Sequence, residues 1–143
     1  MNPDLLFKDG NPETTNNPII TCSEKRSKYI ADNPGRKMNC KIRIDGALIK
    51  IKNVSKCDYG LWVDDGNRMI LIELKGSDVK KALKQLCSTY EIFQKRFVNE
   101  DFSYSYRIVP TRVTTPNLQE HVKKLRKRGY DLIIRTKELR EEI

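Results

Sequence analysis

Residues 57–76 read CDYGLWVDDGNRMILIELKG, and this stretch decides the fold. Two runs rich in apolar residues flank an Asp-Asp-Gly-Asn segment, which is typical of a β-hairpin turn. With the Asp-Gly pair as a two-residue loop, counting back along both strands places Asp58 directly opposite Glu73. If the two-residue loop moves by one position, Asp58 faces Lys75 and Glu73 becomes its diagonal neighbour. The two acids and the lysine therefore cluster in either of these registers, whereas a three-residue loop with a bulge would break the cluster.

The chemistry of this cluster favours a divalent cation. Side chains alternate along a strand, so Glu73 and Lys75 share one face. Two facing carboxylates lie about 5 Å apart at Cβ and repel each other unless a proton or a cation intervenes. Mg²⁺ prefers oxygen ligands and keeps positions for water and substrate phosphates, an arrangement suited to phosphodiester cleavage. Lys75 would then orient the attacking water or stabilise the developing negative charge.

The alternative is a ladder of surface salt bridges, which is common in antiparallel sheets. Residues 69–72 read MILI, however, and load both faces of the second strand with apolar side chains. Such a strand is expected in the centre of a sheet, where each unpaired charge is costly to bury. The sequence therefore favours a functional site over a solvated ladder.

Asp58, the Glu73-Leu74-Lys75 tripeptide and a following helix with Gln85 resemble the PD-(D/E)XK nuclease superfamily. The resemblance implies an α/β fold in which helices flank a mixed central β-sheet with a restriction-endonuclease-like αβββαβ core. It also implies a Mg²⁺-dependent phosphodiesterase, with Mn²⁺ as a substitute, that acts as an endonuclease on DNA rather than on RNA.

The resemblance assigns roles by position. It makes Asp58 and Glu73 the metal-binding acids, with the backbone carbonyl of Leu74 as a further ligand. It makes Lys75 the catalytic lysine. Cys57 stands where the proline that gives the superfamily its name would be, which weakens the recognition more than the mechanism.

The helix that follows the lysine strand offers two further candidates. Some branches of the superfamily use a glutamine or a tyrosine there, and Gln85 and Tyr90 are the residues of those types. Tyr90 falls on the apolar stripe of this helix and is expected in the core. Gln85 lies at the border of the stripe. It would either reach phosphate or a metal-bound water, or bond to backbone.

Length and composition indicate one domain with a polyanionic partner. The chain has 143 residues, a net charge of +9 and a pI near 9.4, which favours nucleic acid. No stretch has the length of a membrane span, so no membrane partner is predicted and a cytoplasmic location is expected. The cysteines are scattered and His121 is the one histidine, so reduced thiols are expected and a zinc site is not.

The N-terminal part is predicted to hold a loose arm and a short helix. Residues 1–18 are rich in turn formers and are expected to be flexible, with residues 19–143 forming a single nuclease-like domain. Thr21 to Glu24 has the form of a capping box that opens a helix ending before Asn33. First-helix glutamates join the active site in parts of the superfamily, so Glu24 is an additional metal-ligand candidate. A capping role explains it without function.

Patterning also predicts the elements on either side of the hairpin. Residues 41–44 and 48–52 alternate around Asp45-Gly46, which indicates a second hairpin. Ser77 can cap a helix with apolar positions at helical spacing. These positions are Val79, Leu83, Leu86, Tyr90, Phe93 and Phe97.

The C-terminal third is predicted to contain a strand over 104–109, with extension past Pro110 left open. A helix over 117–128 and a strand over 130–134 follow, which implies a right-handed parallel crossover. The tail from Lys137 is expected to extend as a short helix. The second helix carries a basic run that favours phosphate contacts over an ordinary solvated face. The run comprises Lys123, Lys124, Arg126, Lys127 and Arg128.

The sequence therefore leaves three functions open. The first is a single-domain metal-dependent nuclease in which Asp58 and Glu73 bind Mg²⁺ and Lys75 assists the attacking water. The second is a binding module for nucleic acid or protein that keeps the fold without turnover. The third is a nuclease subunit that needs another chain, and a homodimer is one form of such a complex.

Overall fold

The computed structural model describes residues 1–74, 76–112 and 118–143, and within these ranges strands predominate over helices. The predicted α/β class with a mixed sheet is confirmed. In chain order the elements are α1 (Pro3–Leu6), η1 (Lys8–Gly10), β1 (Glu13–Thr15), β2 (Ile19–Glu24), β3 (Ser27–Asp32), β4 (Asn39–Arg43), β5 (Tyr59–Val63), η2 (Asp65–Asn67), β6 (Arg68–Leu74), α2 (Val79–Arg96), β7 (Ser103–Val109), α3 (Leu118–Lys127), β8 (Leu132–Ile134) and β9 (Glu138–Glu142). Among the helices of these ranges, none combines the length and the apolar character needed to cross a membrane.

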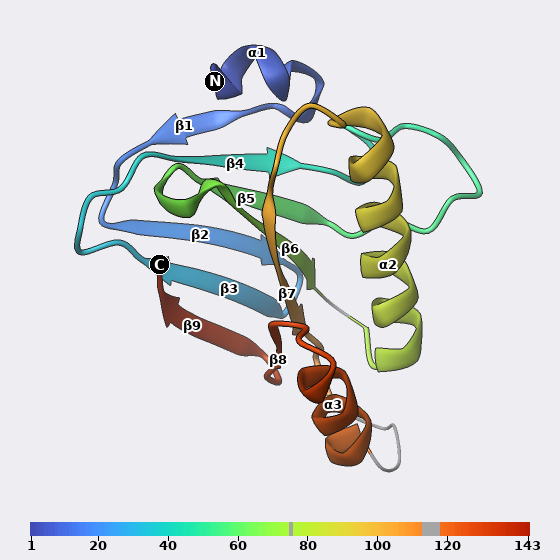
Figure 1. Ribbon diagram of the computed structural model, residues 1–143. Helices are drawn as coiled ribbons and strands as arrows, with labels where there is room; N and C mark the ends of the chain where they lie inside the picture. Colours follow the sequence, from blue (N-terminus) through green and yellow to red (C-terminus); the bar gives the residue numbers. More distant parts are fainter. Residues whose placement is uncertain (75, 113–117) are drawn as a thin grey trace.

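The larger sheet has six strands in the described part of the chain, in the order β1-β4-β5-β6-β7-β8. Neighbours from β1 to β6 pair antiparallel, whereas β6, β7 and β8 run parallel. Parallel neighbours need a crossover, and α2 and α3 provide the two crossovers. Figure 1 shows α1 beside β1 at one end of the sheet and α3 beside β8 at the other. The predicted parallel arrangement of the last two strands of this sheet is confirmed.

The β5–β6 hairpin sits inside this sheet, between β4 and β7. Its turn spans residues 64–67, and the Asn67 N–H donates to the Asp64 carbonyl at 2.9 Å. Gly66 and Asn67 have φ values of 76° and 47°, which glycine and asparagine tolerate better than other residues. The Trp62 indole N–H donates to Asn67 Oδ1 at 2.8 Å. The turn is thereby tied to its own strand.

A second sheet, with the order β2-β3-β9 in the described residues, covers one face of the larger sheet. Its inward side chains, among them Tyr29 and Leu139, pack with Ile70, Ile72 and Leu74 of β6. The opposite face of the larger sheet packs against α2 and α3 through a separate cluster of buried residues. β6 is therefore covered on both faces, as its run of apolar residues predicts.

Helix α2 begins after Asp78, whose side chain accepts the Lys81 N–H at 3.1 Å. The cap is therefore Asp78 and not the predicted Ser77. Most of the predicted apolar stripe is buried, and Phe97, at the end of α2, has its ring centroid 5.4 Å from that of Phe7. Phe7 is fully buried, so residues 1–18 contribute to the core and to the sheet edge through β1. These residues hold α1, η1 and β1.

The helix predicted from Thr21 to Asn33 is wrong, because this segment forms the antiparallel β2–β3 hairpin. Ile20 and Cys22 on β2 are buried on the inner face with Tyr29 and Ala31 on β3, at positions two apart along each strand. Lys25, at the turn, has a φ of 48°. The residue types of a capping box also occur in strands. Pairing of β3 with β9 stabilises the extended conformation of this segment.

Two further predictions fail for tertiary reasons. Residues 48–52 form no strand: the Ile49 N–H donates to the Ile44 carbonyl at 2.9 Å, which closes a compact turn whose apolar side chains enter the core. The tail from Lys137 forms β9 instead of a helix, because it pairs in parallel with β3. Strand β7 ends at Val109, so Pro110 lies just outside it. β7 is an internal strand of the sheet and not an edge strand.

Ionic contacts join the two sheets around Arg107, whose exposed fraction is 2%. Its Nε donates to Glu141 Oε2 of β9 at 2.5 Å, and its Nη1 donates to Asp131 Oδ1 at 3.1 Å. Ser105 Oγ donates to Asp131 Oδ2 at 2.8 Å and accepts the Arg68 Nε–H at 2.9 Å. A buried guanidinium needs such partners, and here they fix β9 against β7.

Candidate active site

Asp58 and Glu73 face each other where β5 begins and β6 ends. Tyr59 pairs with Ile72 in the antiparallel ladder, and one further step along both chains places Asp58 opposite Glu73. The predicted register is thus confirmed. The exposed fractions of Asp58 and Glu73 are 1% and 4%, so both acids are buried. Two carboxylates at facing positions are about 5 Å apart at Cβ.

Both acids lie on the side of the larger sheet that packs against α2. Ile72 and Leu74 belong to the cluster under the second sheet, so alternation turns Glu73 to the other side. Tyr59 also packs towards the second sheet, which places Asp58 on the same side as Glu73. The pair is therefore at the carboxyl end of β6, the strand that leads into α2.

The Asp58 carboxylate holds the end of the hairpin together. Its Oδ2 accepts the backbone N–H of Leu74 at 2.9 Å in a buried setting. Hydrogen bonds to an ionised carboxylate are stronger than neutral ones, and burial increases the difference. Asp58 therefore fixes the backbone on the carboxyl side of Glu73, whatever further role it has.

Helix α2 holds the segment that leads into Asp58. Gln85 Nε2 donates to the Lys56 carbonyl at 3.3 Å. Thr89 Oγ1 accepts the Cys57 N–H at 2.9 Å and donates to the Gln85 carbonyl at 2.7 Å. Of the two roles open to Gln85, the structure supports the backbone contact, which makes it a positioning residue.

Thr89 was missed by sequence reasoning, although a polar residue on the buried side of α2 was a usable signal. Its contact also explains Cys57. Proline has no N–H to donate, whereas the Cys57 amide bonds to Thr89. Burial raises the pKa of the Cys57 thiol, and the charges of Glu73 and Asp58 add to the increase while the Thr89 contact opposes it. Cys57 is thus a neutral, packed side chain beside the two acids.

Lys75, the third member of the predicted cluster, lies outside the described residues. Leu74, the last residue of β6, is buried with its side chain towards the second sheet. Across the described ranges, no three His, Cys, Asp or Glu side chains gather as a metal-binding group. The oxygen donors present are those of the Asp58–Glu73 pair and of the adjoining backbone.

The structure does not bring Glu24 to this pair. Glu24 is the last residue of β2, and its Oε1 lies 2.5 Å from Arg43 Nη1 in an ion pair. The Arg43 guanidinium lies over the Tyr59 ring, 4.8 Å from its centroid. Alternation along β4 and β5 places these groups on the second-sheet side, opposite Glu73. Glu24 is therefore a structural ion-pair partner in a strand, not a capping residue.

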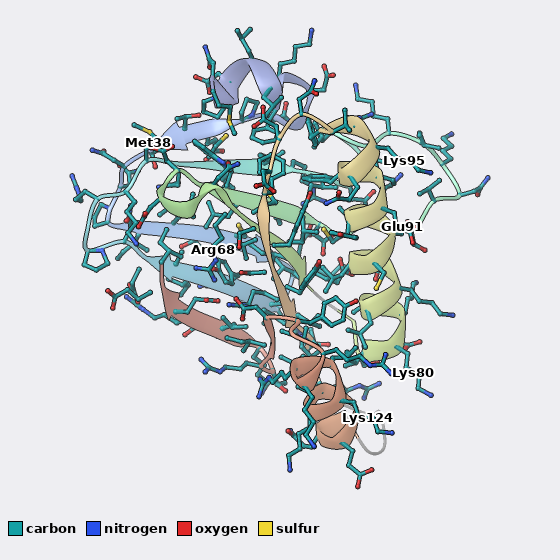
Figure 2. All side chains as sticks on the ribbon, viewed as in Figure 1. Met38, Arg68, Lys80, Glu91, Lys95 and Lys124 are labelled. Carbon is teal, nitrogen blue, oxygen red and sulfur yellow. The ribbon has the colours of Figure 1, made fainter. Side chains whose placement is uncertain are left out.

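The basic run of α3 is exposed, as either a phosphate-binding surface or an ordinary solvated face would be. The exposed residues are Lys123, Lys124, Arg126, Lys127 and Arg128. Arg126 Nε also donates to the Leu132 carbonyl at 3.0 Å, which holds α3 to β8. Figure 2 shows Lys80, in the first turn of α2, at the same end of the molecule as Lys124. Lys80, Lys81 and Lys84 are exposed and extend the cationic surface, a cluster that sequence reasoning left unused.

A scan against protein-family models and searches of curated proteins and of solved structures found no match for this chain. The site itself has a definite chemical character. Two buried acids meet at the carboxyl end of a parallel strand pair, the end at which open α/β sheets bind ligands. Exposed cations of α2 and α3 lie at the same end. Such a site suits an anionic ligand and a hard cation together.

Proposed function

We propose that this chain is a metal-dependent nuclease that hydrolyses phosphodiester bonds, in DNA rather than in RNA. The observation that carries the proposal is the buried Asp58–Glu73 pair at the carboxyl end of β6. The order of β4, β5, β6, α2 and β7 agrees with the strand-strand-strand-helix-strand part of a restriction-endonuclease-like core. The β2–β3 hairpin stands where that core would have its first helix.

The donor set of the site fits Mg²⁺ or Mn²⁺. Asp58, Glu73 and the Leu74 carbonyl offer oxygen, the ligand type that these cations prefer. A bound cation polarises the scissile phosphate and lowers the pKa of a coordinated water. Because both acids are buried, their charges act in a medium of low dielectric and hold a cation more firmly than surface carboxylates would.

The remaining tasks fall to other residues of the chain. Lys75 stabilises the negative charge that grows on the phosphate or orients the attacking water. Gln85 and Thr89 keep Asp58 in place through the backbone of residues 56 and 57. The cations of α2 and α3 hold neighbouring phosphates of the substrate strand.

The test is a cleavage assay with single-stranded and duplex DNA in the presence of Mg²⁺ or Mn²⁺. Asp58→Asn, Glu73→Gln and Lys75→Ala should each lower the rate by at least about a hundredfold. The matched control is Asp64→Asn, which removes an exposed carboxylate at the other end of the same hairpin and should cleave like the unaltered chain. Equal cleavage by all five proteins would remove the site.

One observation favours a second function, a nucleic-acid-binding module without turnover. Asp58 accepts a backbone hydrogen bond, and both acids are nearly closed to solvent, as structural acids also are. In that case DNA binds in the presence of EDTA, no metal induces cleavage, and Glu73→Gln leaves binding unchanged. If the chain is a nuclease subunit that needs a partner chain, metal-dependent cleavage would instead occur only when that partner is added.

A further inference from the structure

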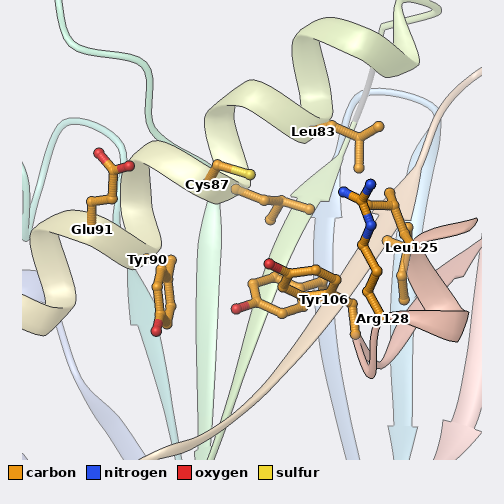
Figure 3. A pocket seen from close by; sticks show the side chains of 10 residues that line it. Leu83, Cys87, Tyr90, Glu91, Tyr106, Leu125 and Arg128 are labelled. Carbon is orange, nitrogen blue, oxygen red and sulfur yellow. The ribbon is translucent and has the colours of Figure 1, made fainter.

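A pocket of about 340 Å³ opens between α2 and α3, above β7 and β8 (Figure 3). Its walls are mostly apolar and include Leu83 from α2 and Leu125 from α3. Tyr90, Tyr106 and Tyr130 supply aromatic surface, and Arg128 supplies a cation at the α3 side. This volume lies within the range of pockets that bind small planar ligands.

The three tyrosines form an aromatic cradle at the surface. The ring centroid of Tyr106 is 6.5 Å from that of Tyr90 and 6.1 Å from that of Tyr130, with interplanar angles of 64° and 69°. Tyr90 and Tyr130 are 36% and 49% exposed, so much of their ring surface faces solvent. Exposed aromatic rings grouped around a hollow are suited to stacking with another planar ring.

The charges around the pocket favour a ligand that carries an anionic group beside its ring. Arg128 and Glu91 lie at opposite ends of the pocket, as Figure 3 shows. Arg128 continues the basic run of α3, which includes Lys124 and Lys127. A ligand with a planar ring and an anionic group would therefore place the ring among the tyrosines and the anion towards α3. A nucleotide unit of a strand has both parts.

We propose that this pocket binds one unpaired nucleobase of a single DNA strand whose backbone follows α3. Stacking on aromatic side chains beside a cationic groove is the general means of holding single strands. A paired base inside a duplex is already stacked on its neighbours and would have to be extruded. The substrate class is therefore single-stranded DNA or a DNA end or junction with unpaired bases.

The position of the pocket relative to the acids supports this assignment, which here rests on the proposed nuclease function. Glu73 pairs with Ile108, and Leu71 pairs with Tyr106, in the parallel β6–β7 ladder. Tyr106 is thus one strand and two residues away from Glu73, or about 8 Å between Cα atoms. Both residues lie on the α2 side of the sheet. A base on Tyr106 would belong to a nucleotide adjacent to the phosphate at the acids.

The test measures binding alone, in EDTA, by fluorescence anisotropy of a labelled single-stranded oligonucleotide. Tyr90→Ala and Tyr130→Ala should each weaken binding by roughly tenfold, since stacking contributes about 1–3 kcal/mol per base. Tyr90→Phe keeps the ring and should bind like the unaltered chain. Lys95→Ala, at the far end of α2 from Lys80 (Figure 2), should bind normally apart from a small charge effect. Circular dichroism of each variant confirms folding.

Two further oligonucleotides sharpen the result. A duplex, and a single strand with abasic positions, should bind the unaltered chain about as weakly as the intact strand binds Tyr90→Ala. The proposal is overturned if the tyrosine variants bind as tightly as the unaltered chain, if abasic and intact strands bind equally, or if no strand binds. Tyrosine-dependent binding without cleavage in Mg²⁺ would refute the proposed catalysis and leave the base pocket standing.

Discussion

Asp58 illustrates how one residue can serve the fold and the site together. Its carboxylate accepts the Leu74 N–H in the core, and it faces Glu73 across the hairpin. A substitution that removes the oxygen therefore changes structure as well as charge. Asparagine keeps an oxygen at nearly the same place, so the two roles can be separated.

We expect Asp58→Ala to lower the free energy of unfolding by about 2–3 kcal/mol, because it leaves a buried N–H without its charged acceptor. Asp58→Asn should lose about 1 kcal/mol, because its amide oxygen still accepts that hydrogen bond. Urea denaturation of both variants measures the difference. Equal losses would mean that the contact with Leu74 contributes little.

Predictions for single residues succeeded where the local sequence determines the structure. They failed where the structure depends on pairing with a strand that is distant in the sequence. The Asp-Asp-Gly-Asn turn set the hairpin register, and with it the meeting of Asp58 and Glu73. Glu24 was assigned to a helix because its capping box is a local signal, whereas its ion pair with Arg43 depends on the packing of two sheets. Nothing in the local sequence distinguishes these outcomes.

At the scale of elements, β9 shows the same dependence on distant partners. The segment is short and charged, which suggested a helix, yet it pairs with β3 and carries Glu141 to Arg107. The β5–β6 hairpin, α2 and the strands around α3 were predictable because local turn residues or apolar periodicity mark them in the sequence. The three-stranded sheet was not predictable, because its strands acquire their identity only when they meet.

The contacts of Asp131 next to β8 predict how stability varies with pH. Burial alone would raise the pKa of Asp131, but hydrogen bonds from Arg107 and Ser105 and the charge of Arg68 outweigh it and hold the pKa below its ordinary value. The unfolded chain therefore takes up this proton first as the pH falls. The stabilisation by Asp131 is complete above about pH 5, where the carboxyl group is ionised in both the folded and the unfolded chain. It is lost progressively as the pH falls from about 3.9, the ordinary pKa of the unfolded chain, through the lower pKa of the folded chain.

Asp131→Asn should consequently have a lower melting temperature than the unaltered chain near neutral pH, and the gap should narrow below about pH 4. Thermal unfolding followed by circular dichroism between pH 3 and pH 7 measures it. The control is Asp101→Asn, an exposed acid in the loop before β7. A gap that is constant over this range would show that the ionised state of Asp131 does not matter for stability.

The charge distribution of the whole molecule gives a prediction about DNA binding. The chain has a net charge of +9, and its α3 cations are exposed. If they contact phosphates, replacing Lys123, Lys124 and Lys127 by alanine should reduce the slope of log K against log salt concentration by about 2 on a single strand. Anisotropy titrations between about 50 and 200 mM salt give that slope.

The comparison needs a variant that loses the same charge elsewhere. Lys8 on η1, Arg36 before β4 and Lys95 near the end of α2 are exposed, and their replacement by alanine removes three positive charges away from α3. That variant should keep the slope of the unaltered chain. Similar slopes in the two triple variants would indicate that net charge, and not the surface of α3, governs binding.

The pairing of β3 with β9 also has a consequence for the order of folding. The ion pair between Asp32 and Arg140 joins residues 108 positions apart, and the β3–β9 ladder is similarly long-range. Contacts of such separation slow folding, because most of the chain must be arranged before they form. On a ribosome adding 5–20 residues per second, the β2–β3 hairpin would wait roughly 5–20 s for β9. During that interval the edge of β3 that later pairs with β9 has unpaired backbone groups and is open to non-native strand pairing.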